Sequence, residues 1–89
     1  MGRCILVYDI SHDGTRTKIA DACLDYGLDR IQYSAFVGSL MRTHQEELML
    51  RIKRLLGRRE GSIQLFPLCE KDWKERHVIE RRPKEKDHE

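Results

Sequence analysis

The sequence lacks several features that would assign a function by themselves. No apolar segment approaches the roughly 20 residues that a membrane-spanning helix needs. The three cysteines, Cys4, Cys23 and Cys69, form no Cys-x-x-Cys pair, so a zinc site is not indicated. No internal repeat is evident, and only Gly14 lies in a polar loop suited to a small ligand. These absences argue against a membrane protein, a zinc protein and a metabolite-binding module.

Charge is abundant but nearly balanced. The 17 Lys and Arg residues against 15 Asp and Glu residues leave a net charge of +2, so the total alone does not indicate nucleic acid. The 89 residues predict one soluble domain with a modest core, which a second copy would help to stabilise. The N-terminus leads directly into an apolar strand rather than a signal peptide, and we expect a cytoplasmic location.

The first strand organises the chain. Residues 3–10 form an almost unbroken apolar run that contains one carboxylate, Asp9. Such a run is typical of a central strand buried on both faces. An acid at the end of a central strand, followed by a polar loop, is a common place for a functional site. From the residues alone, however, Asp9 is equally well explained as a solvated acid at a strand end.

Two amphipathic helices follow from spacing and end signals. Asp13 is the predicted N-cap of the first helix, which ends at Gly27. Thr43 and Glu46 match a capping box for the second helix, which ends at Gly57. The apolar stripe of the first helix contains Ile19, Ala22, Cys23 and Tyr26. That of the second helix contains Leu48, Met49, Ile52, Leu55 and Leu56.

The remaining segments read as strands. Residues 28–41 are extended and form either two strands or one long bent strand. Residues 62–66 alternate before Pro67, and residues 77–80 predict a short final strand. We expect a domain over residues 1–80 and a charged, disordered tail over residues 81–89.

This order of elements predicts an α+β fold. A split βαβ arrangement would give a two-layer sandwich, with an antiparallel sheet and both helices on one face. The other sheet face would stay open, and a second copy of the chain is its simplest cover.

Two stretches resemble a known family. Val7–Ser11 (VYDIS) and, more specifically, Tyr26–Gly38 (YGLDRIQYSAFVG) resemble the small CRISPR-associated endonuclease of the spacer-acquisition complex, the "Cas-two" family. The resemblance extends from the first strand to about Ile79. It implies a ferredoxin-like fold, a symmetric homodimer, and an integrase as partner. It also implies Mg²⁺ (or Mn²⁺) held near Asp9 of both subunits, and cleavage of phosphodiester bonds in RNA or DNA.

The resemblance also suggests site residues. Asp9 would be the metal ligand and a catalytic residue, and Tyr8 could pack or lend its hydroxyl to the reaction. Arg16, Lys18 and Arg30 would contact nucleic acid, although the family often has arginine where Lys18 stands. Asp13 and His12 are more simply a helix cap and a loop residue. A dense basic cluster could track a DNA backbone or be only a helix end; it comprises Arg51, Lys53, Arg54, Arg58 and Arg59.

The sequence is compatible with two functions. One is a metal-dependent endonuclease in CRISPR adaptation. The other is a non-catalytic scaffold that holds DNA and bridges integrase subunits, for which the basic cluster and residues 73–80 would matter more than Asp9.

Overall fold

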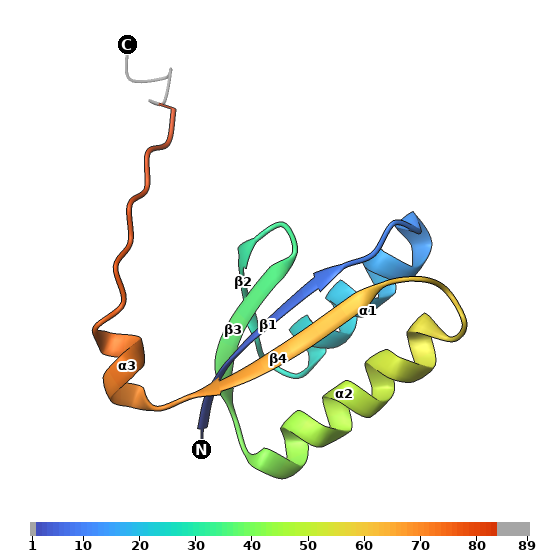
Figure 1. The fold of residues 1–89 in the computed structure, drawn as a ribbon, viewed down its shortest axis with the longest axis horizontal. Helices are drawn as coiled ribbons and strands as arrows, with labels where there is room; N and C mark the ends of the chain where they lie inside the picture. The colour runs from blue at the N-terminus through green and yellow to red at the C-terminus, as the bar shows by residue number, and fades with distance from the viewer. Residues whose placement is uncertain (1, 84–89) are drawn as a thin grey trace.

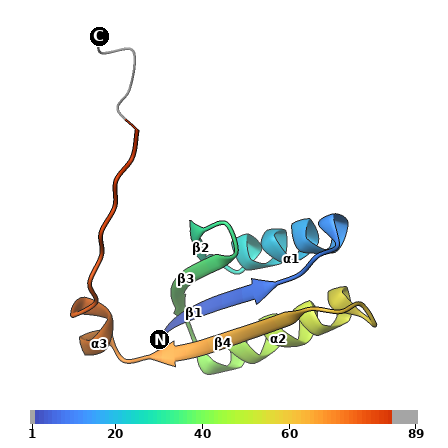
Figure 2. The ribbon, with the colours of Figure 1, turned by 45° about the horizontal axis from the view of Figure 1, so that its top comes forward.

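The computed structural model describes residues 2–83 and confirms the α+β fold (Figure 1). The elements, in chain order, are β1 (Gly2–Asp9), α1 (Asp13–Asp25), β2 (Asp29–Gln32), β3 (Ala35–Leu40), α2 (Arg42–Leu56), β4 (Ser62–Leu68) and α3 (Glu70–Lys74). The four strands form one antiparallel sheet in the order β2-β3-β1-β4. Figure 2 shows α1 and α2 on the same face of this sheet, which is the ferredoxin-like arrangement.

Strand β1 lies at the centre of the sheet, between β3 and β4, as its sequence predicts. Its burial nevertheless alternates: Cys4, Leu6 and Tyr8 are buried, whereas Ile5 and Val7 are only half-buried. The prediction of burial on both faces is therefore wrong for the single chain, because the two helices cover only one face.

The core fills the space between the sheet and the two helices. Phe36 of β3 is fully buried there, with Ile19 of α1 and Leu48 of α2. Gly38 allows a close approach: a Cβ atom at this position would lie 2.6 Å from Leu28 Cδ2. A larger residue would therefore displace the segment that leads from α1 into β2.

Both helix ends are as predicted, but both helix starts differ. Gly27 and Gly57 follow the helices with positive φ angles of 87° and 60°, a conformation that glycine adopts without strain. His12, not Asp13, caps α1, because its Nδ1 accepts a hydrogen bond from the Thr15 amide at 3.1 Å.

The predicted capping box at the start of α2 is also wrong. Met41 already has an extended backbone and precedes the first helical residue, Arg42. Thr43 therefore lies two residues beyond the N-cap position, so Thr43 and Glu46 form no capping box, and no side chain caps this end. Gln45 instead donates a hydrogen bond to the Leu40 carbonyl at 3.0 Å.

Residues 28–41 form two strands, β2 and β3, joined by a turn at Tyr33 and Ser34, with an irregularity between Arg30 and Gln32. Strand β4 continues through Pro67, which an edge strand tolerates because its outer N–H groups need no partner.

The predicted strand over residues 77–80 is wrong: after β4, the described chain contains only α3 and irregular backbone. Cys69 caps the start of α3, because its Sγ accepts a hydrogen bond from the Asp72 amide at 3.4 Å. Arg3 anchors α3 to β1 through an ion pair with Glu70 at 3.2 Å. Residues 81–83 are irregular and exposed, and residues 84–89 of the predicted tail lie outside the described part. Between residues 2 and 83, no helix has the length and hydropathy of a membrane span.

Candidate functional site

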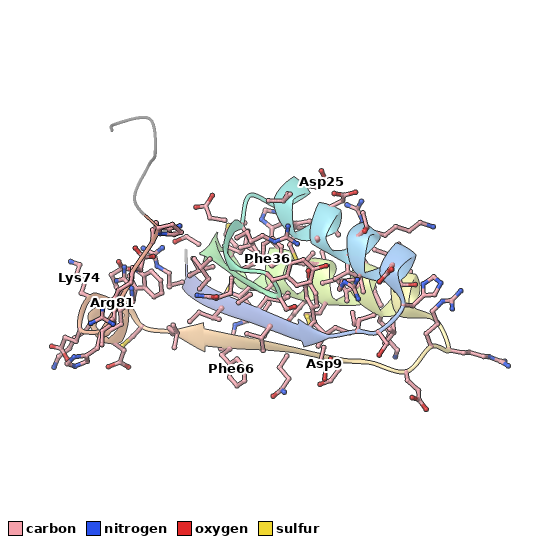
Figure 3. All side chains as sticks on the ribbon, turned by 90° about the horizontal axis from the view of Figure 1, so that it is seen from above. Asp9, Asp25, Phe36, Phe66, Lys74 and Arg81 are labelled. Atoms are coloured by element: carbon pink, nitrogen blue, oxygen red, sulfur yellow. The ribbon has the colours of Figure 1, made fainter. Side chains whose placement is uncertain are left out.

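Asp9 is the last residue of β1 and lies opposite Ser62 of β4. Its side chain is exposed on the sheet face turned away from the helices (Figure 3). Within residues 2–83, no ion pair involves the Asp9 carboxylate. The position and exposure are those predicted for a strand-end acid that is available to a ligand.

An apolar surface extends from Asp9 along the same face. Ile5 and Val7 of β1 contribute to it, and Phe66 of β4 pairs directly with Ile5. Phe66 is 46% exposed and points away from the helices, whereas Phe36 points toward them (Figure 3). We call Ile5, Val7 and Phe66 the open face.

Tyr8 lies on the opposite side of β1 from Asp9, as expected for neighbours in a strand. It is only 6% exposed, and its ring stacks on Phe36 with centroids 6.0 Å apart. Its hydroxyl accepts a hydrogen bond from Arg30 Nη2 at 3.4 Å. The structure therefore does not bring the two candidate catalytic side chains together on one face.

Arg16 is engaged almost entirely with its own chain. Its Nη1 donates to the Ile10 carbonyl at 2.8 Å and to the Ser11 carbonyl at 3.3 Å, and its Nη2 pairs with Asp13. Its Nε donates to the Tyr33 hydroxyl at 3.1 Å. The hydrogen bond to Asp13, followed by that to Tyr33, raises the pKa of Arg16 above its usual value. Arg16 thus ties the loop after Asp9 to α1 and to the β2–β3 turn.

Arg30 and Lys18 are exposed. The Arg30 guanidinium lies over Phe36 at 5.0 Å and over Tyr33 at 5.5 Å from the ring centroids. The sequence alone predicts no functional role for Tyr33. Its position in the turn depends on where β2 ends and β3 begins, which the alternation of residues 28–41 left undecided.

The basic cluster is divided between the end of α2 and the following loop. Arg51 pairs with Asp25 of α1 at 3.2 Å, so part of its charge is compensated within the chain. Arg58 and Arg59 are exposed in the loop that leads back to the sheet. A Cβ atom at Gly61 would lie 3.4 Å from the Asp9 carbonyl, so this loop ends beside Asp9. The structure therefore brings Arg58 and Arg59 to the same end of the sheet as Asp9 (Figure 1).

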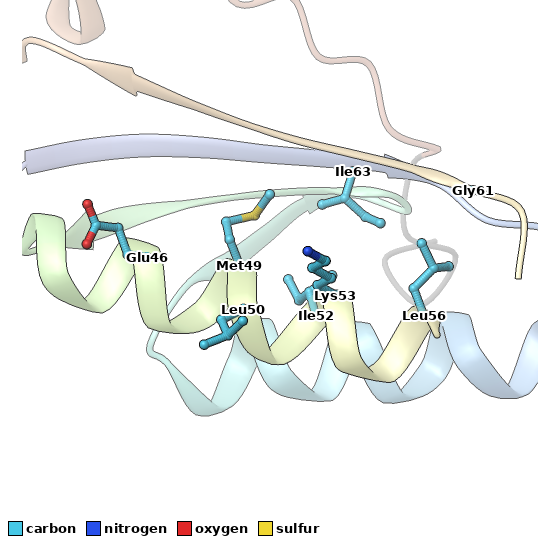
Figure 4. Close-up of a pocket in the computed structure, with 8 residues that line it drawn as sticks. All are labelled: Glu46, Met49, Leu50, Ile52, Lys53, Leu56, Gly61 and Ile63. Carbon is cyan, nitrogen blue, oxygen red and sulfur yellow. The ribbon is translucent and has the colours of Figure 1, made fainter. Parts of the chain in front are cut away.

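A groove of about 560 Å³ lies between α2 and β4. Met49, Leu56 and Ile63 point into it, and its charged lining residues are Glu46 and Lys53 (Figure 4). A mainly apolar lining does not suit a phosphate backbone, which is bound by cations and N–H donors.

One chain offers few ligands for a metal. Residues 2–83 contain no group of three His, Cys, Asp or Glu side chains close enough to hold an ion. Asp9 supplies the oxygen donors that Mg²⁺ prefers, but a single carboxylate is too few. The donor chemistry therefore fits Mg²⁺ or Mn²⁺ only if a second copy contributes its own Asp9.

The cysteines offer no reactive nucleophile in the core. Burial raises the pKa of the Cys4 thiol, and it raises the pKa of Cys23 to about 12. Both thiols therefore stay protonated at neutral pH, which confirms their interpretation as small buried apolar residues. Cys69 is exposed.

Comparison with known proteins defines the class to which this ferredoxin-like domain belongs. Residues 1–76 match the family model of the CRISPR associated protein Cas2. A CRISPR-associated endoribonuclease Cas2 from Chloroflexus aurantiacus is 49% identical over 78 residues, which cover 88% of this chain and 92% of the relative. The chain therefore belongs to the Cas2 family, as the two sequence motifs predict.

Solved structures agree with this family. A hypothetical protein, TT1823 from Thermus thermophilus, superposes with a TM-score of 0.77 at 28% identity and covers 92% of this chain and 94% of its own. A chain from a partial Cas6-RT-Cas1–Cas2 complex superposes with a TM-score of 0.76 at 26% identity. That match covers 89% of this chain and 91% of the other.

Proposed function

We propose that this protein is a metal-dependent endonuclease of CRISPR adaptation, which cleaves phosphodiester bonds in RNA or DNA. The observation that carries the proposal is the Asp9 carboxylate, exposed and without an ion-pair partner in the described chain, at the end of the open face. The relative from Chloroflexus aurantiacus, named an endoribonuclease, supports this activity.

The active form is a symmetric homodimer. In this dimer, the open face of one copy packs against the open face of the other, because burying the exposed apolar surface around Phe66 lowers the free energy. Asp9 stands at the edge of this surface, so a two-fold axis near β1 would bring the two Asp9 carboxylates toward each other.

The paired Asp9 carboxylates would hold Mg²⁺ or Mn²⁺. When bound, such an ion supplies polarisation of a phosphate and a more acidic water. The chain itself orients the carboxylate: β1 fixes the backbone of Asp9 between β3 and β4, and Arg16 fixes the loop that follows. Tyr8 supports this arrangement from the helix face through its hydrogen bond with Arg30.

The exposed cations would supply affinity for the nucleic acid. Phosphate contacts are independent of sequence and weaken steeply with salt. Arg58 and Arg59 lie at the Asp9 end of the sheet, and Lys18 of α1 and Arg30 of β2 are exposed. Arg51 and Arg54, at the end of α2, would extend the contact.

A second function rests on another observation. The chain is similar to a chain of the partial Cas6-RT-Cas1–Cas2 complex, which favours an integrase of the Cas1 kind as partner. A scaffold that bridges integrase subunits and holds DNA would need the dimer and the cations, but no chemistry at Asp9.

Two assays separate these functions. Purified wild-type protein and Asp9→Asn are incubated with RNA and duplex DNA and with Mg²⁺, and the dimer is checked in parallel. We expect cleavage by the wild type alone, and equal cleavage by the variant would refute the catalytic assignment. In a spacer-acquisition assay with Asp9→Ala, retained acquisition favours the scaffold, whereas lost acquisition favours catalysis.

A further inference from the structure

A small hollow lies between α1 and the β2–β3 turn, on the helix side of the sheet. It has a volume of about 270 Å³ and is lined mainly by polar side chains, among them Arg16, Thr17, Asp21, Arg30 and Tyr33. Tyr33 is 66% exposed, the largest exposed fraction among the tyrosines and phenylalanines of residues 2–83. The Tyr33 ring is therefore available to a ligand that enters the polar hollow.

The Tyr33 ring is held in place although it is exposed. Its hydroxyl accepts the hydrogen bond from Arg16 Nε at 3.1 Å, and the guanidinium groups of Arg16 and Arg30 lie 5.6 and 5.5 Å from its centroid. Such contacts stabilise the ring by cation–π attraction. A ligand that stacks on Tyr33 would therefore meet a ring whose conformation is already restricted, which lowers the entropic cost of binding.

The two arginines differ in the donors they have left. Arg16 uses four of its five N–H groups on Ile10, Ser11, Asp13 and Tyr33. In the described chain, Arg30 makes one side-chain hydrogen bond, the long one to Tyr8 at 3.4 Å. Arg30 therefore keeps N–H donors for an outside acceptor, whereas Arg16 serves to position Tyr33.

We infer that Tyr33 is a stacking platform for an unpaired nucleobase, with an adjacent phosphate bound by Arg30. This inference rests on the proposed function, because it assumes a nucleic-acid substrate, and it assigns to Tyr33 the contact with an unpaired base. Aromatic side chains bind such bases face to face with little sequence preference. Asp21 repels phosphate but accepts hydrogen bonds, so the hollow beside Tyr33 suits the amino edge of a base. Bases within a duplex have both faces covered and cannot use the platform.

The test measures binding, not cleavage. Fluorescence anisotropy at low salt compares short single-stranded RNA, single-stranded DNA and duplex DNA on the full chain. The variants are Tyr33→Leu, which keeps apolar bulk without a π face, and Tyr33→Phe, which keeps the ring but removes the acceptor for Arg16. Leu50→Ala is the matched control, because Leu50 is an exposed apolar residue of α2 outside the hollow.

We expect Tyr33→Leu to weaken single-strand binding about tenfold, as loss of one base–aromatic stack predicts. Duplex binding should change little, and Tyr33→Phe and Leu50→Ala should resemble the wild type. A single 2-aminopurine in the oligonucleotide should be quenched on binding to the wild type and less so on binding to Tyr33→Leu. If Tyr33→Leu binds single-stranded RNA, single-stranded DNA or both more weakly than the wild type does, the stacking role is supported. The strand that is affected shows whether the platform accepts ribose, deoxyribose or both.

Three results would overturn the inference. Tyr33→Leu could leave single-strand binding unchanged, or weaken single-strand and duplex binding equally. Tyr33→Phe could lose as much affinity as Tyr33→Leu, which would assign the effect to the hydrogen bond with Arg16. In each case nucleic-acid binding by the wild type persists, so the proposed function stands. If the wild type binds no oligonucleotide, the proposed function fails as well.

Discussion

Phe66 provides the sharpest test of the proposed dimer. It is 46% exposed, which leaves about 90 Å² of an aromatic side chain of about 200 Å² in contact with water. At about 25 cal/mol per Å², covering this area would contribute about 2.3 kcal/mol per subunit. Two subunits then give about 4.6 kcal/mol, so Phe66→Gln should weaken the dimer on the order of a thousandfold.

The measurement is sedimentation equilibrium over a wide range of protein concentration. Leu50→Gln is the matched control, since Leu50 is 48% exposed but lies on α2, away from the open face. We expect its dissociation constant to stay near that of the wild type. A monomeric wild type, or an equal loss of dimer in both variants, would refute the assignment of the open face as the dimer interface.

Three further predictions concern the packing behind the site. Gly38→Val should destabilise the fold by about 1–3 kcal/mol in urea denaturation, because its Cβ would lie 2.6 Å from Leu28 Cδ2. Unchanged stability would show that the segment around Leu28 can move to make room for the valine side chain. Arg16→Lys removes the planar guanidinium that binds the Ile10 and Ser11 carbonyls, the Asp13 carboxylate and the Tyr33 hydroxyl. Amide hydrogen exchange in the loop at residues 11–12 should therefore accelerate more than exchange in the sheet. The raised pKa of Cys23 stabilises the folded state fully below the pKa of an unfolded thiol, near 9, and this contribution should be lost as pH rises to about 12. In the native protein at neutral pH, a thiol reagent should therefore modify Cys69 well before Cys23, and equal rates would contradict the burial of Cys23.

The helices and the central strand could be predicted because their signals are local. The apolar stripe that contains Ile19 and Cys23, and the glycines at positions 27 and 57, depend only on neighbours in sequence. The N-cap residues could not be predicted, because several residues near the start of each helix are suited to the N-cap position. Met41 enters α2 from β3 with an extended backbone, so the helix begins before the side chain of Thr43 can cap it.

The site was predicted only in part. Strand alternation places Asp9 and Tyr8 on opposite faces, which the sequence already indicates. The partners of Arg16 come from the β1–α1 loop and the β2–β3 turn, so its role inside the chain depends on tertiary structure. Tyr33 was missed for the same reason, and Cys69 was not predicted as a cap, since α3 is a short helix without an apolar stripe.

We propose that one metal ion is shared by the Asp9 carboxylates of two chains. Isothermal titration of the purified protein with Mn²⁺ tests it directly, because it measures stoichiometry independently of turnover. We predict one ion for every two chains, and loss of this binding in Asp9→Asn with the dimer intact. One ion per chain, or unchanged Mn²⁺ binding by Asp9→Asn, would show that the two Asp9 carboxylates do not share an ion.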